Sequence, residues 1–366
     1  MDPRILFVTR KWRPAMGGME IYCERLVEQL ERHEPVDCVA LPGREDGRPP
    51  PATSLLSFPL TVLRRWIARS HAPQVLHLGD MAIWPFGLLA RLSAGDCTVV
   101  LSAHGTDVSY PARGGLRGTL YGWYQRIGAR ALGRARVIAN SATTARAAEA
   151  LGWNVAKIVP LATDMEPARD ATGIARRILF AGRLVERKGC GWFVREVLDR
   201  LPSDIVLDIA GTGWHARETQ VFEHRRVNFL GRLDRPSLAQ AYARSLCTIV
   251  PNLDLETGEF EGFGLVACEA SAAGGVVLAA ATGGLIEAVR DEETGFLLPP
   301  GNAQAWLDCI LKVAAWTESE RAGFTTRASA AARSFYRWER VAGETVELYP
   351  GDVGKGRSAT PEIGNP

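Results

Sequence analysis

The sequence predicts an α/β fold in which two doubly wound domains face each other across a deep cleft. At 366 residues the chain is longer than one typical hydrophobic core requires. Short apolar runs alternate with segments of helical spacing, a pattern typical of parallel strands joined by helices. This alternation occurs twice, before and after a polar stretch at 166–176. We expect one domain at 1–165, a second at 166–335, a C-terminal helix at 336–350 packed back on the first domain, and a disordered tail at 351–366.

The first half of the chain carries five predicted strands and four predicted helices. The strands are short buried apolar runs at 5–8, 36–41, 75–78, 98–103 and 136–140. The helices are expected at 19–32, 55–69, 82–92 and 143–151. Pro59 is expected to mark the start of the helix at 55–69, because proline suits the first helical turn. Apolar residues alternate with arginines there, which fits either a helix packed on the sheet or a contact with a membrane surface.

The second half repeats the series. Strands are predicted at 178–181, 205–210, 227–230, 247–250 and 276–280. Helices are expected at 193–198, 306–316, 318–336 and 338–349, in addition to one that follows Gly264. Thr317 and Glu320 have the spacing of a capping box at the start of the helix at 318–336.

Composition excludes several classes of function. A net charge of +2 gives no overall signature of nucleic-acid binding. The seven cysteines form no C-x-x-C pair, so metal and redox motifs are absent and free thiols in a reducing cytoplasm are expected. The first strand begins almost at the N-terminus and no 18-residue apolar run occurs, so we expect neither a signal peptide nor a membrane span.

The charges are nevertheless uneven. Seven arginines and no acidic residue lie between Arg113 and Arg146. Such a patch is either a solvated surface or a site of attraction to an anionic membrane or phosphate.

In the stretch from Gly258 to Gly274, the carboxylates Glu261 and Glu269 lie before and within a helix that two glycines open. Unpaired N–H groups at a helix N-terminus bind phosphate well. Carboxylates beside them are poor ligands for bare phosphate and good ligands for hydroxyl groups. The stretch therefore predicts a site for the hydroxyls of a sugar or ribose beside a bound phosphate.

Two further segments of interest follow predicted strands of the first domain. Gly17 and Gly18 form a loop between the first strand and the first helix, where backbone N–H groups can meet a phosphate, although Gly-Gly alone is ordinarily a turn. His104 ends the fourth strand and should face the ligand crevice of the sheet.

These motifs occur together, in one order, over both domains. They are Gly17-Gly18, His104-Gly105-Thr106-Asp107, Gly182-Arg183 with Lys188-Gly189, Gly211-Thr212-Gly213, Glu261 with Glu269, Gly283-Gly284 with Glu287, and Thr294-Gly295-Phe296-Leu297. In this order the chain resembles the retaining GT-B glycosyltransferases of family four, which have two Rossmann-like domains. The resemblance spans almost the whole chain and implies an acceptor-side first domain and a second domain that binds a nucleotide sugar.

The resemblance also implies roles for individual residues. Arg183 and Lys188 match the cations on the donor pyrophosphate, and stabilise charge that grows on the leaving group. Glu269 matches the acid that binds the ribose hydroxyls. Glu261 matches the acid beside the donor sugar, and His104 matches a residue near the anomeric carbon. The other implied donor-binding residues are Gly17, Gly18, Gly211, Gly213, Phe263, Gly264 and Leu265.

The expected function is transfer of a hexose-type sugar from a nucleotide diphosphate sugar to a glycan, lipid-linked or small-molecule acceptor, in bacterial polysaccharide or glycolipid synthesis. No metal or other cofactor is expected, and no nucleic-acid partner. The expected location is the cytoplasm, with peripheral contact to an anionic surface of the inner membrane. Two alternatives stay open: another nucleotide-sugar enzyme of this fold, such as an epimerase or a phosphorylase, and a non-catalytic partner subunit.

Overall fold

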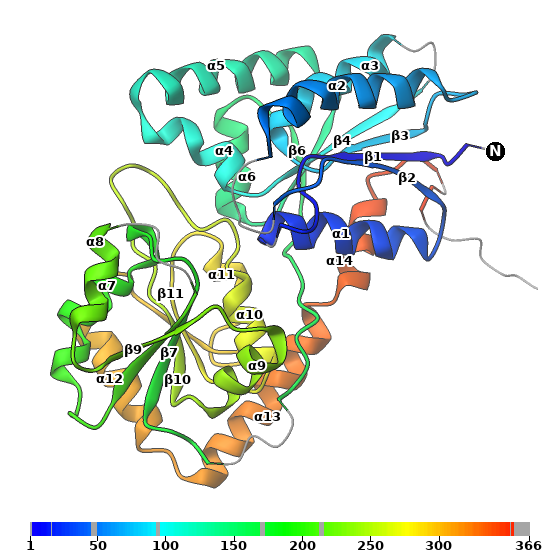
Figure 1. Ribbon diagram of the computed structural model, residues 1–366. Coiled ribbons are helices and arrows are strands. Elements are labelled where there is room, and N and C mark those ends of the chain that lie inside the picture. The colour runs from blue at the N-terminus through cyan, green and yellow to red at the C-terminus, as the bar shows by residue number, and fades with distance from the viewer. Residues whose placement is uncertain are drawn as a thin grey trace, which may run out of the picture.

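Two parallel sheets organise the protein, as predicted, and each has six strands (Figure 1). The computed structural model describes residues 2–15, 17–44, 50–92, 96–168, 173–211, 216–351 and 353–354. The first sheet has the order β2-β1-β3-β4-β5-β6, and the second has the order β12-β11-β10-β7-β8-β9. In both sheets the strand order reverses next to the first strand, β1 or β7, which places the ligand crevice of each sheet beside that strand.

The strands of the first sheet agree closely with the predicted ones, with one addition. They are β1 (Ile5–Thr9), β2 (Val36–Ala40), β3 (Val75–Leu78), β4 (Thr98–Ala103), β5 (Arg136–Ala139) and β6 (Val155–Ile158). No strand was predicted in the region of β6. β6 is an edge strand with only half-buried residues alternating with exposed ones, so it lacks the apolar run that revealed the other strands.

Helices cover both faces of this sheet. They are α1 (Gly18–Glu31), α2 (Ala52–Ile67), η1 (Met81–Phe86), α3 (Gly87–Leu92), α4 (Thr106–Ser109), η2 (Tyr110–Arg113), α5 (Gly115–Ala131) and α6 (Ala142–Ala150). Alternate residues of β1 divide the two faces: Ile5 and Phe7 pack with α1, while Leu6 and Val8 pack in the core of α2, η1 and α5. Figure 1 shows α2 and α5 along the outer side of the domain, away from α1.

The prediction that Pro59 starts a helix is wrong. Helix α2 begins at Ala52, directly after Pro51, and Pro59 lies inside it. A proline inside a helix leaves the carbonyl four residues earlier, that of Leu55, without its N–H partner. Pro59 and Leu55 both lie on the exposed side of α2, where water can supply that hydrogen bond.

Helix α5 was not predicted, because its four glycines lower helix propensity. The structure gives two of them a packing role. A β-carbon on Gly118 would lie 2.9 Å from the Pro111 carbonyl oxygen, and one on Gly128 would lie 2.7 Å from the Trp84 ring. The glycines therefore allow α5 to approach η1 and η2 closely.

The second domain follows the predicted series and adds a short edge strand, β12. Its strands are β7 (Arg177–Ala181), β8 (Val206–Ala210), β9 (Val227–Gly231), β10 (Cys247–Val250), β11 (Val277–Ala280) and β12 (Phe296–Leu298). Its helices are η3 (Glu186–Lys188), α7 (Cys190–Glu196), η4 (Leu198–Arg200), α8 (Ala216–Thr219), η5 (Gln220–Glu223), α9 (Arg235–Arg244), α10 (Leu265–Ala272), α11 (Leu285–Ala288), α12 (Ala303–Ala314) and α13 (Glu318–Phe335). The capping box of Thr317 and Glu320 at the start of α13 is confirmed.

Helix α14 (Trp338–Val346) returns to the first domain and lies beside α1 (Figure 1). Arg32, directly after α1, donates to Glu339 of α14 at 3.1 Å. Beyond the helix, the Tyr349 hydroxyl lies 2.7 Å from Nδ1 of the buried His77 in β3. The chain thus crosses between the domains twice. Most of the tail predicted to be disordered, 352 and 355–366, lies outside the described residues.

Candidate active site

The carboxyl ends of the two sheets meet at a contact between two glycine loops. Gly105 follows β4 in the first domain, and Gly262 lies just before α10 in the second. A β-carbon on Gly262 would lie 2.3 Å from the His104 carbonyl oxygen, and one on Gly105 would lie 2.6 Å from Cα of Gly262. The structure therefore brings two predicted site residues, His104 and Glu261, to neighbouring positions of one interdomain contact.

Glu261 stands at the centre of a cluster of cations. Its Oε2 atom lies 2.6 Å from Nη1 of Arg187 and 2.7 Å from Nζ of Lys188. The Nδ2 atom of Asn252 donates to the same oxygen at 3.2 Å. Each of the three charged side chains is 12–14% exposed, so the cluster is largely withdrawn from solvent.

Burial and charge act in opposite directions on this cluster. Burial raises the pKa of Glu261, but Lys188 and Arg187 outweigh it and lower the pKa to about 2. Burial lowers the pKa of Lys188, in spite of Glu261. Burial and the nearby Arg187 also lower the pKa of Arg183, which makes no ion pair or hydrogen bond among the described side chains. The site thus holds more positive charge than its own carboxylate balances.

His104 is buried on the opposite side of the contact. Its Nε2 lies 3.0 Å from the Gly79 carbonyl oxygen, so Nε2 carries the proton and Nδ1 is free to accept. Nδ1 is buried and has no partner among the described atoms. The Tyr22 ring packs edge-on against the imidazole with centroids 4.6 Å apart, and the Asp107 carboxylate accepts from the His104 backbone N–H at 2.9 Å. The ring is therefore fixed in orientation.

The glycine loop of the first domain also reaches the second domain. Gly17 and Gly18 open helix α1, and no side chain caps its first N–H groups. A β-carbon on Gly18 would lie 3.3 Å from Cδ1 of Leu265, the first residue of α10. The N-termini of two helices, one from each domain, therefore point into the same region, where their free N–H groups favour an anion.

Glu269 lies one turn inside α10, and burial raises its pKa although Arg235 opposes this effect. Arg235 is held by Asp164, which also accepts from Arg25 of α1. Asp164 thus bridges the two domains next to Glu269.

The remaining predicted donor-binding residues that the structure describes lie in loops of the second domain that follow its strands. A β-carbon on Gly211 would lie 2.0 Å from the Gly182 carbonyl oxygen, so the loops after β7 and β8 pack closely. Gly264 has a positive φ of 95° and caps α10. The Phe263 ring is 2% exposed and packs near Tyr336, so it belongs to the core, and only the backbone of Phe263 can meet a ligand. Gly213 lies outside the described residues.

Sequence reasoning missed Arg187, Asn252 and Glu287 as site-forming groups. Arg187 directly precedes Lys188, and spacing alone could not show that both reach Glu261. Asn252 follows β10, and its position at a strand end was a usable signal. Glu287 was noted only as part of a motif; its Oε1 accepts from the Ala142 N–H of the first domain at 2.7 Å.

Two kinds of feature are absent from the described part of the chain. No group of three or more His, Cys, Asp and Glu side chains there is placed to hold a metal ion. None of its helices is long and apolar enough to cross a membrane.

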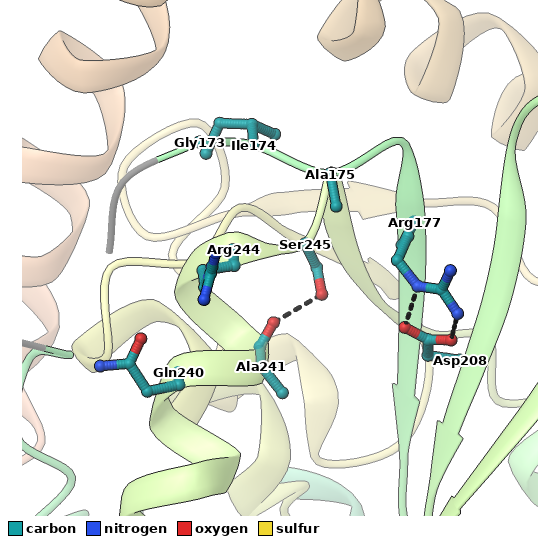
Figure 2. Close-up of a pocket in the computed structure, with 9 residues that line it drawn as sticks. All are labelled: Gly173, Ile174, Ala175, Arg177, Asp208, Gln240, Ala241, Arg244 and Ser245. Carbon is teal, nitrogen blue, oxygen red and sulfur yellow. Dashed lines mark hydrogen bonds and ion pairs between the residues drawn. The ribbon is translucent and has the colours of Figure 1, made fainter. Parts of the chain in front are cut away.

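Figure 2 shows a pocket away from this site. It lies at the amino end of β7, where Arg177 donates to Asp208 at 2.5 Å and Arg244 of α9 lies nearby. The cleft residues follow the carboxyl ends of the strands, so this pocket is at the opposite edge of the second sheet and contains none of the predicted site residues.

Comparison with known families matches each domain separately. Residues 16–166 match the family described as Glycosyltransferase Family 4, and residues 175–315 match the family described as Glycosyl transferases group 1. Between them the two matches cover most of the chain.

Curated relatives and a solved structure agree with these matches. A D-inositol 3-phosphate glycosyltransferase of Xylanimonas cellulosilytica is 33% identical over 181 residues, which are 47% of this chain and 41% of the relative. The chain likewise spans less than half the length of other curated relatives. A phosphatidyl-myo-inositol mannosyltransferase of Mycobacterium leprae is 28% identical over 305 residues, 78% of this chain and 75% of the relative.

The structure of HepE from Anabaena in complex with UDP-glucose superposes with a TM-score of 0.68 at 18% identity, over 94% of this chain and 99% of HepE. Such a likeness shows the fold, with its two facing parallel sheets. Since the fold and both domain matches agree, the chain belongs to the GT-B glycosyltransferases of family four.

Proposed function

We propose that the protein is a retaining glycosyltransferase that moves a hexose-type sugar from a nucleotide diphosphate sugar to an acceptor bound by the first domain. The observation that carries the proposal is the cluster of Glu261, Lys188 and Arg187 beside the His104 loop. An ionised carboxylate set among cations, at the meeting point of two sheets, suits a sugar attached to a diphosphate. An epimerase or a non-catalytic subunit has no comparable support in this geometry.

The donor is proposed from the charges and the helix ends. The cations at Arg183, Arg187 and Lys188 exceed the single carboxylate of their cluster, and the N-terminus of α1 is uncapped. Both features favour a diphosphate. HepE, which shares the fold, binds UDP-glucose. The same cations would neutralise the leaving group without a divalent metal, so the proposal keeps the reaction metal-independent.

The chemistry proposed is a front-face displacement. The acceptor hydroxyl oxygen forms a bond to the anomeric carbon on the face from which the diphosphate oxygen departs. The bond between that carbon and the diphosphate breaks, and the hydroxyl proton passes to the departing phosphate. Glu261 supports positive charge on the sugar in the transition state, and the fixed Nδ1 of His104 accepts a hydrogen bond from a sugar hydroxyl.

The acceptor is proposed to be a glycan, a lipid-linked sugar or a small polyol, in cell-surface polysaccharide or glycolipid synthesis. The names of the two relatives both contain a phosphorylated inositol, free in one and lipid-linked in the other. These names support an acceptor with ring hydroxyls beside a phosphate.

A membrane-facing surface on the first domain supports the lipid-linked choice. Nine of the fourteen exposed large apolar side chains in the described part of the chain lie on α2 and α5. Each helix carries four at the same helical spacing: Leu56, Leu60, Leu63 and Ile67 on α2, and Leu116, Leu120, Trp123 and Ile127 on α5. Arg117, Arg126 and Arg130 flank the α5 stripe and form no ion pair with the described residues. We propose that this face contacts an anionic bilayer at the cytoplasmic side of the membrane.

The proposed membrane contact predicts that the protein binds lipid vesicles and floats with them, and that this binding depends on vesicle charge and on residues of α5. The protein should float with vesicles that contain phosphatidylglycerol, and raised salt should weaken this binding because the arginine attraction is screened. Trp123→Gln and Arg117→Gln should each weaken it, whereas Leu311→Gln, at a similarly exposed apolar residue of α12, should not. Equal binding to neutral vesicles, or no binding at all, contradicts the proposal.

The proposed donor class is tested by thermal melting against a panel of nucleotide sugars. A ligand that binds only the folded protein raises its melting temperature. At a hundredfold excess over its Kd, such a ligand adds about 2.7 kcal/mol to the free energy of unfolding. We expect one UDP-, GDP- or ADP-sugar to raise it and the matching nucleoside monophosphate to raise it less, because the diphosphate contacts the cations. A panel in which no nucleotide sugar has any effect refutes the proposed function.

A further inference from the structure

Three donors converge on one oxygen of Glu261. Arg187, Lys188 and Asn252 all reach Oε2, and Oε1 accepts no hydrogen bond from the described residues. A carboxylate oxygen has two lone-pair directions, so three donors exceed what Oε2 needs. One donor can therefore leave while Glu261 keeps a charged partner.

Lys188 is the donor best suited to leave. Burial lowers the pKa of its ammonium group even with Glu261 beside it, so additional negative charge would stabilise the charged form. Its ammonium is a compact charge on a flexible stem that can turn to a new partner, whereas the planar guanidinium of Arg187 holds a fixed geometry.

Arg187 is tied to the segment that carries Glu261. Both cations lie in the single turn of η3, but the Arg187 carbonyl oxygen also accepts from the Leu253 N–H at 3.0 Å. Leu253 follows Asn252 on the segment that runs from β10 towards Glu261. Arg187 is thus connected to the acid loop through its backbone and through its side chain.

The charges of the cluster explain why an exchange is needed. Arg183, Arg187 and Lys188 lie near Glu261, and Glu20 of the first domain also acts on Arg183, so the three cations outnumber the two nearby carboxylates and leave positive charge for an incoming diphosphate. When Lys188 forms an ion pair with a diphosphate, Glu261 loses one of the two cations that keep it ionised. Burial raises the pKa of this carboxyl, so without a remaining cation it would take up a proton.

We infer that Arg187 is a positioning residue that keeps Glu261 ionised and in place while the donor diphosphate takes Lys188. Lys188 is the partner that exchanges between Glu261 and the diphosphate, and Arg187 is the partner that stays. The inference rests on the proposed function in one respect only, that the anion is the diphosphate of a sugar donor.

The exchange is tested with inorganic pyrophosphate as the probe, so no donor needs to be known. In the wild-type background Glu261→Gln should tighten pyrophosphate binding by about tenfold, the size of a coupling between charged neighbours, because Lys188 is released. The tightening should persist in the Arg187→Gln background and shrink in the Lys188→Gln background. Calorimetric titration of the single and double variants measures it. The inference is overturned if Glu261→Gln tightens pyrophosphate binding equally in both backgrounds, or if this tightening is lost only in the Arg187→Gln background.

The pH dependence of transfer tests the positioning role. In the wild-type protein Glu261, with a pKa of about 2, stays ionised throughout the working range. In Arg187→Gln with donor bound, burial raises that pKa above the ordinary 4.5, so activity should be present at high pH and fall as pH decreases through the raised value. We expect kcat to fall on acidification in this variant, at pH values where the wild-type rate stays constant.

Two comparison variants separate this role from a general structural one. Arg187→Lys should restore the wild-type pH profile, because it restores the charge, and Arg225→Gln at an exposed arginine of the same domain should leave it unchanged. A flat profile for Arg187→Gln overturns the inference. If no nucleotide sugar is turned over, the proposed function fails, while the pyrophosphate titrations still decide the role of Arg187.

Discussion

Glu261→Gln is expected to lower kcat by about a hundred- to a thousandfold, the size of the loss when one preorganised group that stabilises transition-state charge is removed. Glutamine has nearly the same shape and can still hydrogen-bond, so only the negative charge is lost. That charge is held ionised by Lys188 and Arg187, and it would face the positive charge that develops on the transferred sugar. Initial transfer rates, measured beside the circular dichroism and melting temperature of the variant, give the result.

Two further variants show whether the cluster acts as proposed. Lys188→Ala should also abolish transfer, and it should weaken diphosphate binding, which Glu261→Gln should not. Glu256→Gln neutralises an exposed acid on the same loop and should leave activity unchanged. A Lys188→Ala, Glu261→Gln double variant with full activity would show that this cluster does not carry the reaction.

The fold was predictable wherever burial leaves a periodic trace in the sequence. β4 and β10 have the predicted bounds because both strands are almost fully buried and read as continuous apolar runs. β6 left no such trace because it is a half-exposed edge strand. Helix α5 was hidden by its glycines, two of which its packing on Trp84 and Pro111 requires, and that requirement exists only in three dimensions.

The site was predictable as a set of segments and not as a set of contacts. Strand ends and glycine loops indicated His104, Gly18 and Glu261, and the structure brings their segments to one interdomain contact. The pairing of Arg187 with Glu261 joins residues 74 positions apart, and no local pattern reveals such a pair. The core position of the Phe263 ring was also invisible, because an aromatic residue beside a glycine fits a core and a binding site equally well.

The contact between the two glycine loops explains why residue 262 is a glycine. Two further interdomain contacts flank this contact: Arg113 with Glu259 at 2.6 Å, and the Ala142 N–H with Glu287 at 2.7 Å. The nearest atoms around a β-carbon on Gly262 all belong to the first domain, and Gly262 is not among the glycines with a positive φ. Gly262 is therefore glycine because the domains approach there, and its backbone conformation does not require it.

Gly262→Ala is accordingly expected to separate donor binding from transfer. The added methyl group, 2.3 Å from the His104 carbonyl oxygen, must push the two loops apart, while the second domain keeps its own packing. A displacement on the order of 1 Å at reacting groups costs about a hundredfold in rate, so kcat should fall by that amount. Diphosphate binding, measured by calorimetry, should weaken much less than transfer, because the charged groups Lys188 and Arg183 lie in the second domain and only the N–H groups of α1 lie in the first. Gly343→Ala, at a helical position in α14 with open space around it, is the matched control and should keep full activity.

Wild-type transfer by Gly262→Ala would mean that the reaction does not need this interdomain contact. A parallel loss of diphosphate binding would place the fault within the second domain. Only loss of transfer with retained binding shows that the acid loop acts on a sugar held between the two domains.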